Sequence, residues 1–291
     1  MTGWNAADIP EQYGRTFVVT GANSGLGEVA TAALAAAGGT VVMACRDEKK
    51  ATEVAQRIGD RVLVRHLDLA DLGSVREFAA SMGPIDVLIN NAGVMAVPFR
   101  QTADGFEMQI GTNHLGHFAL TGLLIDRISD RVVTLSSDAH NWGSVDLDDL
   151  NWERRSYNRW RAYGASKVAN LLFTYELQRK LTAAGSSVIS VAAHPGYAAT
   201  GLQSNTESIL DRVMWLGNKL IAQSAEMGAL PELYAATAVG VTGGSYYGPD
   251  GIRQMRGYPK RVGSNAESRD QELAAALWAR SEELTGVRYP V

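Results

Sequence analysis

The chain has 291 residues, of which 46% are hydrophobic and 20% charged, and its formal net charge is −4. This length suits one large α/β domain spanning residues 1–291, and the charge gives no electrostatic reason to bind nucleic acid or an anionic membrane. Cys45 is the only cysteine, which excludes an internal disulfide and a cluster of thiolate metal ligands. With no signal-like start and no apolar run of membrane-spanning length, we expect a cytoplasmic protein without a membrane span.

Apolar runs and helix-forming segments alternate along the chain. Strands are predicted at residues 16–20, 40–45, 61–67, 86–90, 131–136, 187–193 and 244–247. Helices are predicted at residues 28–37, 47–58, 72–81, 105–128, 162–181 and 268–284. This order predicts an α/β fold with a doubly wound parallel sheet and helices on both faces. No repeat or proline-rich linker marks a domain boundary.

A glycine-rich turn joins the first strand to the first helix. Such a turn directs backbone N–H groups and the positive end of the helix at a pyrophosphate, and glycine permits the close approach. A plain structural turn is the alternative. The residues predicted to contact a dinucleotide here are Gly21, Asn23, Ser24, Gly25, Leu26 and Gly27.

Polar residues follow the later strands at the edge where open parallel sheets bind ligands. Each has a structural alternative, such as capping a helix or satisfying a turn, but together they predict a cofactor and an active site at one edge. In chain order the candidate residues, polar ones and their neighbours, are Asp68 with Leu69, then Asn91, Ala92 and Gly93, then Asn113 in the long helix, Ser136 and Ser137, and finally His194, Pro195, Gly196 and Thr200.

Tyr163 and Lys167 lie four residues apart in a predicted helix and therefore share one face. A cation about 4 Å away is worth about 4 kcal/mol at an effective dielectric of about 20, which lowers the pKa of a phenol by up to about three. Such a tyrosine could act as an acid or base near neutral pH. Taken alone, the pair is also what an exposed helix carries by chance.

Together these motifs resemble those of the short-chain dehydrogenase/reductases, in residue order and in position relative to the strands, over about residues 14–250. Within that superfamily the chain resembles the retinol dehydrogenase-like and protochlorophyllide reductase-like branch, with Trp4, Asp8, Ile9, Pro10 and the run from Ala44 to Asp47 in support. The resemblance implies a single NAD(P)-binding Rossmann-like domain.

The resemblance also implies roles in interconverting a carbonyl and an alcohol. Tyr163 would exchange the proton, and Lys167 would lower the pKa of Tyr163 and bind the nicotinamide ribose. Ser137 would hold the substrate oxygen, with Ser136 supporting the strand end. Asn113 would anchor a water that relays protons to Lys167.

The end of the second strand predicts NADP(H) rather than NAD(H). NAD-selective folds usually place a carboxylate there, whereas this chain has Cys45 followed by Arg46. A guanidinium can bind a 2′-phosphate. The alternative is that Arg46 faces solvent, and Ser24 stands where some NADP-using relatives carry a second basic residue.

Two segments are candidates for the substrate pocket. The insertion at residues 138–162 is rich in tryptophan and arginine and forms either a surface flap or a pocket wall. An apolar lid is predicted at residues 197–223, and it suits a hydrophobic substrate unless it faces the core. No metal site is predicted, because His114 and His117 lack acidic or cysteine partners in the pattern.

The preferred hypothesis is an NADP(H)-dependent oxidoreductase acting on a small-molecule carbonyl/alcohol pair. A catalytically silent NAD(P)-binding sensor and an unrelated Rossmann-like enzyme, such as a methyltransferase, are the alternatives. The long helices at residues 105–128 and 163–181 form dimer faces in many relatives, so a homodimer or homotetramer is expected.

Overall fold

In the computed structural model, which describes residues 3–197 and 223–291, eight strands form one sheet in the order β3-β2-β1-β4-β5-β6-β7-β8. All neighbouring strands pair in parallel except β7 and β8. The order reverses between β1 and β4, which is where open α/β sheets bind ligands. The strands are β1 (Thr16–Thr20), β2 (Thr40–Cys45), β3 (Val62–His66), β4 (Ile85–Asn90), β5 (Ile128–Leu135), β6 (Ile189–Ala193), β7 (Tyr246–Pro249) and β8 (Pro259–Val262).

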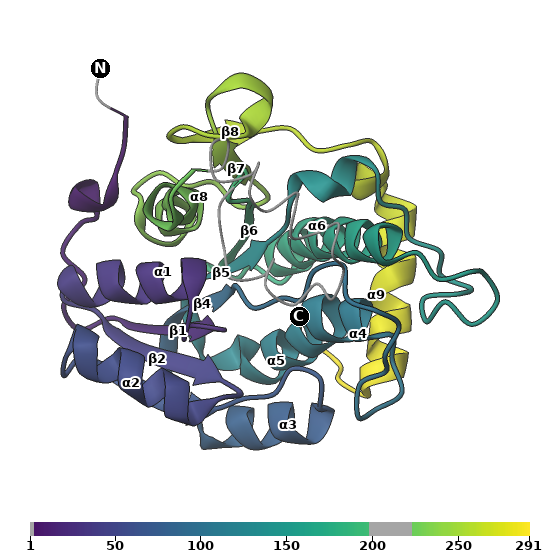
Figure 1. The fold of residues 1–291 in the computed structure, drawn as a ribbon, viewed down its shortest axis with the longest axis horizontal. Helices are drawn as coiled ribbons and strands as arrows, with labels where there is room; N and C mark the ends of the chain where they lie inside the picture. The colour runs from purple at the N-terminus through teal and green to yellow at the C-terminus, as the bar shows by residue number, and fades with distance from the viewer. Residues whose placement is uncertain (1–2, 198–222) are drawn as a thin grey trace.

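Helices cover both faces of this sheet, which confirms the predicted doubly wound fold (Figure 1). On one face lie α1 (Gly25–Ala36), α2 (Glu48–Ile58) and α8 (Ala225–Thr237). On the other lie α3 (Leu72–Ser81), α4 (Met108–Ile110), α5 (Gly116–Leu124) and α6 (Arg159–Ala183), with α9 (Gln271–Thr285) packed outside them. No helix among the described residues is long and apolar enough to cross a bilayer.

Alternation along the strands divides the hydrophobic core between the two faces. Phe17 and Val19 of β1 pack toward α1 and α8, whereas Val18 between them packs toward α3 and α5. All three are fully buried. The period of two in a pleated strand explains why one apolar run supplies both cores.

The long helix predicted at residues 105–128 is shorter and interrupted. Gly105 has a φ of 82°, and the Glu107 carboxylate accepts hydrogen bonds from the N–H groups of Gln109 and Ile110, so the helix begins at Met108. A π-helical turn, Gly111–Leu115, separates α4 from α5. After α5, a 3₁₀ turn leads into β5, which starts at Ile128 rather than at the predicted residue 131.

The C-terminal part contains two elements that the sequence patterns do not predict. Pro231 lies inside α8 and disfavours a helix there, but burial against α1 and the sheet outweighs the local cost. β8 pairs with β7 as an antiparallel edge strand. The predicted C-terminal helix is α9, and it covers parts of α5 and α6. The expected dimer through those two helices stays a prediction.

Candidate active site

The glycine turn after β1 takes the backbone conformation that the sequence predicts. Gly21 and Gly25 have φ values of 66° and 57°, in the left-handed region that favours glycine. A Cβ on Gly27 would lie 2.6 Å from both the Asn91 side-chain nitrogen and the Gly21 carbonyl oxygen. α1 begins at Gly25, within the turn, so its unpaired N–H groups lie at the carboxyl edge of the sheet.

A cavity of about 510 Å³ extends from this turn to Tyr163 and Lys167. The residues predicted to bind the cofactor that line it are Gly21, Asn23, Ser24, Gly25, Leu26, Gly27, Arg46, Asp68, Leu69, Asn91, Ala92, Gly93, Tyr163, Lys167 and Pro195. Gly196 is described but does not line this cavity, and Thr200 and most of the predicted lid lie outside the described residues. The wall also contains residues that the sequence did not single out as ligands: Ala44, Cys45, Asp47, Lys50, Leu67, Val94, Thr112, Leu135 and Ser136.

The end of β4 connects the glycine turn to the rest of the cavity. The Asn91 amide donates to the Thr20 carbonyl at 2.7 Å, and the Ala92 N–H donates to the Thr20 hydroxyl at 2.9 Å. A Cβ on Gly93 would lie 3.2 Å from the Asn113 side-chain oxygen and 3.7 Å from the Lys167 nitrogen. Residues 91–93 therefore form a tightly packed floor beneath the centre of the cavity.

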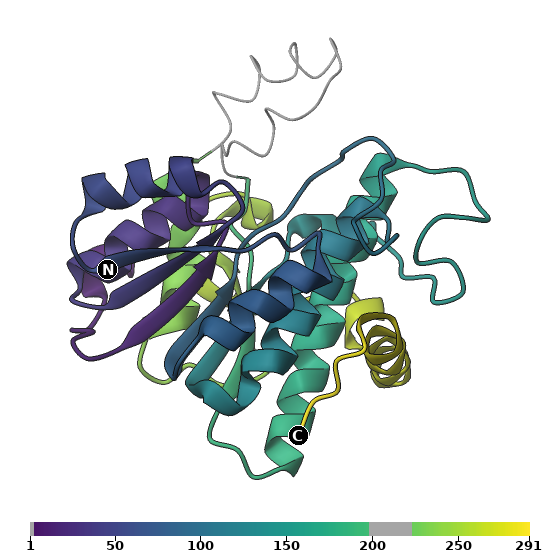
Figure 2. The same cartoon turned by 90° about the horizontal axis from the view of Figure 1, so that it is seen from below.

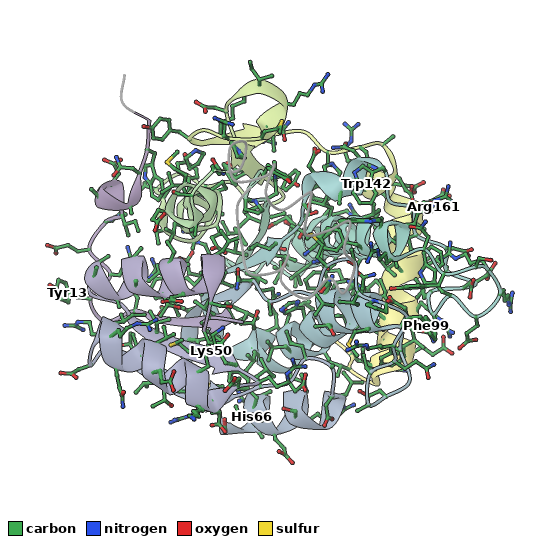
Figure 3. All side chains as sticks on the ribbon, in the orientation of Figure 1. Tyr13, Lys50, His66, Phe99, Trp142 and Arg161 are labelled. Atoms are coloured by element: carbon green, nitrogen blue, oxygen red, sulfur yellow. The ribbon has the colours of Figure 1, made fainter. Side chains whose placement is uncertain are left out.

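The wall at the end of β2 and the start of α2 contains the Cys45 thiol, the cations Arg46 and Lys50, and the carboxylate of Asp47. Cys45 is buried, which raises the pKa of its thiol to about 11. The Arg46 side chain is 72% exposed, and its guanidinium lies 3.8 Å from the Asp68 carboxylate. Lys50 lines the same part of the wall and lies on α2 (Figure 3). Arg46 and Lys50 are cations that can contact an anionic group at the nucleotide end, although Asp47 and Asp68 line the same region.

At the other end, the Ser137 hydroxyl lies near enough to the Tyr163 phenol to lower its pKa, and the Lys167 nitrogen lies over the face of the Tyr163 ring. The Lys167 nitrogen is 5.6 Å from the Tyr163 ring centroid and donates to the Leu135 carbonyl at 3.2 Å. Burial lowers the pKa of Lys167 to about 8. The structure thus brings together three of the four residues predicted to be catalytic.

The structure does not show the predicted lowering of the Tyr163 pKa by Lys167. Burial raises the pKa of the Tyr163 phenol, and the nearby Ser137 hydroxyl opposes that rise only in part. The lysine lies over the ring face rather than beside the oxygen, and it is itself desolvated. The phenol is therefore protonated at neutral pH.

Asn113, the fourth predicted residue, is buried in the π-helical turn and does not line the cavity. Its side chain accepts from the Val94 N–H at 2.8 Å and donates to the Ser166 hydroxyl at 2.9 Å. The backbone carbonyl oxygen of Asn113 is 3.1 Å from Nδ1 of His117. Nε2 of the same histidine is 2.9 Å from the Thr20 hydroxyl. A π-helical turn of this kind often marks a functional position.

The two serines at the end of β5 make different contacts. Ser136 is buried, and its hydroxyl donates to the Lys167 carbonyl at 2.9 Å, as expected of a residue that supports the strand end. Ser137 is half-buried, and its hydroxyl accepts from the Ala139 N–H at 3.2 Å near the Tyr163 phenol. Ser136 lines the cavity wall, whereas Ser137 is not among the lining residues.

The insertion at residues 138–162 forms a loop that projects at the edge of the molecule near α4 and α9 (Figures 1 and 2). None of its residues lines the cavity. Val145 and Leu150 pack with α6 and α9, and the Tyr157 hydroxyl donates to the buried Glu107 carboxylate at 3.0 Å. Most of this segment is therefore a flap held on the outer face.

The histidines of the long helical segment pack in the interior. His114 lies 2.9 Å from the Ser281 hydroxyl of α9, and burial lowers the pKa of its ring to about 3. Burial also lowers the pKa of His117 to about 4. Both rings are neutral at physiological pH and form hydrogen bonds within the chain.

Comparison with known proteins agrees with this geometry. Residues 15–210 match the sequence profile of the short chain dehydrogenase family. Human retinol dehydrogenase 13 is 43% identical over 98% of this chain and 87% of its own length, and human retinol dehydrogenase 12 is 39% identical over 95% and 88%.

Solved structures show the same similarity. An uncharacterized protein from Mycobacterium paratuberculosis is 51% identical over the whole of both chains, with a TM-score of 0.88. An NAD(P)-dependent gluconate 5-dehydrogenase from Beutenbergia cavernae, solved with NADP, is 26% identical over 81% of this chain and 96% of its own, with a TM-score of 0.63.

Proposed function

Because the chain belongs to the short-chain dehydrogenase family and is an oxidoreductase of its retinol dehydrogenase-like branch, we propose that it uses NADP(H) to interconvert a carbonyl and an alcohol on a hydrophobic small molecule. The observation that carries this proposal is that Tyr163 and the buried Lys167 line one end of the cavity that the glycine turn opens, with the Lys167 nitrogen over the Tyr163 ring and the Ser137 hydroxyl near the phenol. A bound nicotinamide cofactor supplies or accepts the hydride.

The residues present fit a dinucleotide. The close approach at Gly27 and the free N–H groups of α1 suit a pyrophosphate, and Pro195 and Lys167 bound the opposite end of the cavity. At the nucleotide end, Arg46 and Lys50 line the cavity beside Asp47 and Asp68. Cys45 stands where NAD-selective folds have a carboxylate that would repel a 2′-phosphate. This charge pattern supports NADP(H).

Tyr163 is the proton donor in this proposal, and Ser137 binds the carbonyl oxygen as negative charge develops on it. Since burial raises the pKa of Tyr163, its phenol carries the proton that reduction of a carbonyl consumes. Lys167 places a positive charge over the face of the Tyr163 ring and stabilises the phenolate that remains after proton transfer.

The named retinol dehydrogenase relatives support a hydrophobic substrate, whereas the aromatic side chains of the insertion do not line the cavity. The Trp142 indole is half exposed and packs edge-on against Trp160, at a ring distance of 6.5 Å. Trp160 precedes Tyr163 by three residues on α6, so it lies on the same helical face. Figure 3 shows Trp142 and Arg161 on the half of the view away from Lys50.

A substrate panel with both cofactors tests this function. Nicotinamide absorbance is followed with aldehydes, ketones and retinoid-like aldehydes, using NADPH and NADH, and Tyr163→Phe serves as the inactive control. NADP(H) should also raise the melting temperature, because a ligand that binds only the native state stabilises it. Absence of a thermal shift with both cofactors contradicts the proposal, and a shift without turnover points to a silent binding protein.

A further inference from the structure

The carbonyl oxygen of Ser137 is held by the residue three positions later. A 3₁₀ turn, Asp138–Asn141, follows β5 and has Ser137 as its N-cap residue. Within it, the His140 ring nitrogen Nδ1 lies 2.6 Å from the Ser137 carbonyl oxygen, and the His140 backbone N–H donates to the same oxygen at 3.1 Å. His140 therefore binds Ser137 through two donors.

The chemistry of this contact defines the tautomer of His140. A carbonyl oxygen only accepts hydrogen bonds, so Nδ1 carries the proton and Nε2 of the neutral ring does not. Nε2 is buried without a hydrogen-bond partner among the described residues, and burial lowers the pKa of the ring. Leaving a buried acceptor unsatisfied costs free energy that an apolar side chain would avoid. The imidazole offsets this cost through its short hydrogen bond to the Ser137 carbonyl oxygen.

Residues distant in sequence hold this ring and its backbone in place. The ring packs edge-on against the buried Tyr246 ring at 5.6 Å, and His194 packs on the same tyrosine at 5.1 Å. The Asn265 amide, from the segment after β8, donates to the His140 carbonyl at 2.6 Å. The Asn265 side-chain oxygen accepts from the Ser268 N–H at 3.0 Å, which fixes the amide orientation.

We infer that His140 is a positioning residue that fixes the Ser137 backbone, and through it the direction of the Ser137 hydroxyl toward Tyr163 and the substrate oxygen. Asn265 supports His140 from the C-terminal part of the chain. The inference rests on the proposed function, because it matters only if Ser137 binds the reacting oxygen. A misplacement of a reacting group by about 1 Å is enough to lower a rate about 100-fold.

The test is a double-mutant cycle between the two residues. His140→Phe keeps a planar ring but removes the donor, and it should lower kcat by about 10- to 100-fold with little change in the cofactor Kd. In the Ser137→Ala background the same change should have little further effect, because the hydroxyl to be positioned is gone. Asn265→Ala should act in the same direction but less strongly.

Asn141→Ala is the matched control for this cycle. The Asn141 amide belongs to the same turn but donates to the Asp138 carbonyl and carboxylate, not to Ser137. It should leave kcat unchanged. Additive losses from His140→Phe and Ser137→Ala, or a large loss in the control, overturn the inference and indicate a general defect of the turn.

A second measurement does not depend on turnover. In ¹⁵N-histidine NMR, the resonances that disappear in His140→Phe should show a neutral ring with the proton on Nδ1, and a proton on Nε2 overturns the inference. The two proposals fail in different ways. If Tyr163→Phe and Ser137→Ala leave turnover intact, the proposed function is wrong. If those two variants lose activity but His140→Phe does not, only the role of His140 is wrong.

Discussion

The two ends of the cavity are built in different ways. At the nucleotide end, the glycine turn and Arg46 come from short sequence segments, and the Arg46 side chain is 72% exposed. At the reaction end, Tyr163 and Lys167 are buried and meet Ser137 only because α6 packs on β5. Solvent screens the charges at the nucleotide end, whereas the charged groups at the reaction end are desolvated. Substitutions at the nucleotide end should therefore change cofactor affinity, and substitutions at the reaction end should change kcat.

The largest effect on kcat is expected from Tyr163→Phe, at the reaction end. Loss of the proton donor should lower kcat about 1,000-fold, within the range for general acid catalysis, while the cofactor Kd changes little. Steady-state turnover and a cofactor titration measure the two effects. Tyr175→Phe is the control, because this phenol lies on the same helix and bonds to Ser264 instead. Retained turnover in Tyr163→Phe contradicts its assigned role.

The burial of Lys167 predicts a pH-dependent stability of the cofactor-free protein. Its pKa is about 8 in the folded state and 10.5 when unperturbed, so between these values the unfolded chain binds more protons and stability rises with pH. Relative to Lys167→Met, the wild type should gain up to about 3 kcal/mol of unfolding free energy across that window. Denaturant titrations at several pH values measure this, and a pH-independent difference contradicts it.

The neighbouring serines offer a paired comparison at the reaction end. Ser137→Ala should lower kcat by about 100-fold, as expected for loss of one donor to a developing oxyanion. Ser136→Ala removes a bond to the Lys167 carbonyl and should affect the melting temperature more than kcat. Turnover and thermal unfolding of both variants decide the matter, and the reverse ranking in kcat overturns the assignment.

The smallest effect is expected at the nucleotide end. Arg46→Ala should raise KM for NADPH about tenfold, the equivalent of one exposed charge-assisted hydrogen bond, and leave KM for NADH unchanged. Lys50→Ala, on the same wall, should act in the same direction. An unchanged ratio of kcat/KM values for the two cofactors in Arg46→Ala shows that the guanidinium does not bind the 2′-phosphate.

Local patterns were sufficient to predict the parallel sheet, the glycine turn and the α6 pair of Tyr163 and Lys167. They were insufficient where contacts between distant parts of the chain determine the geometry or the ends of a helix. The π-helical turn around Asn113 and the helix containing Pro231 depend on packing against other elements. The helix start at Met108 depends on the buried Glu107 carboxylate, whose contacts include Tyr157 from the insertion.

The sequence by itself determined the fold class, the glycine turn and many of the residues that line the cavity, because strand alternation, glycine conformation and helical spacing are properties of neighbouring residues. Only the tertiary structure decided the electrostatics of those residues. Burial, which depends on the whole fold, leaves Tyr163 protonated and lowers the pKa of Lys167. The tertiary structure also brought Asn265, which is distant in sequence, to the carbonyl of His140, whose ring lies 2.6 Å from the Ser137 carbonyl.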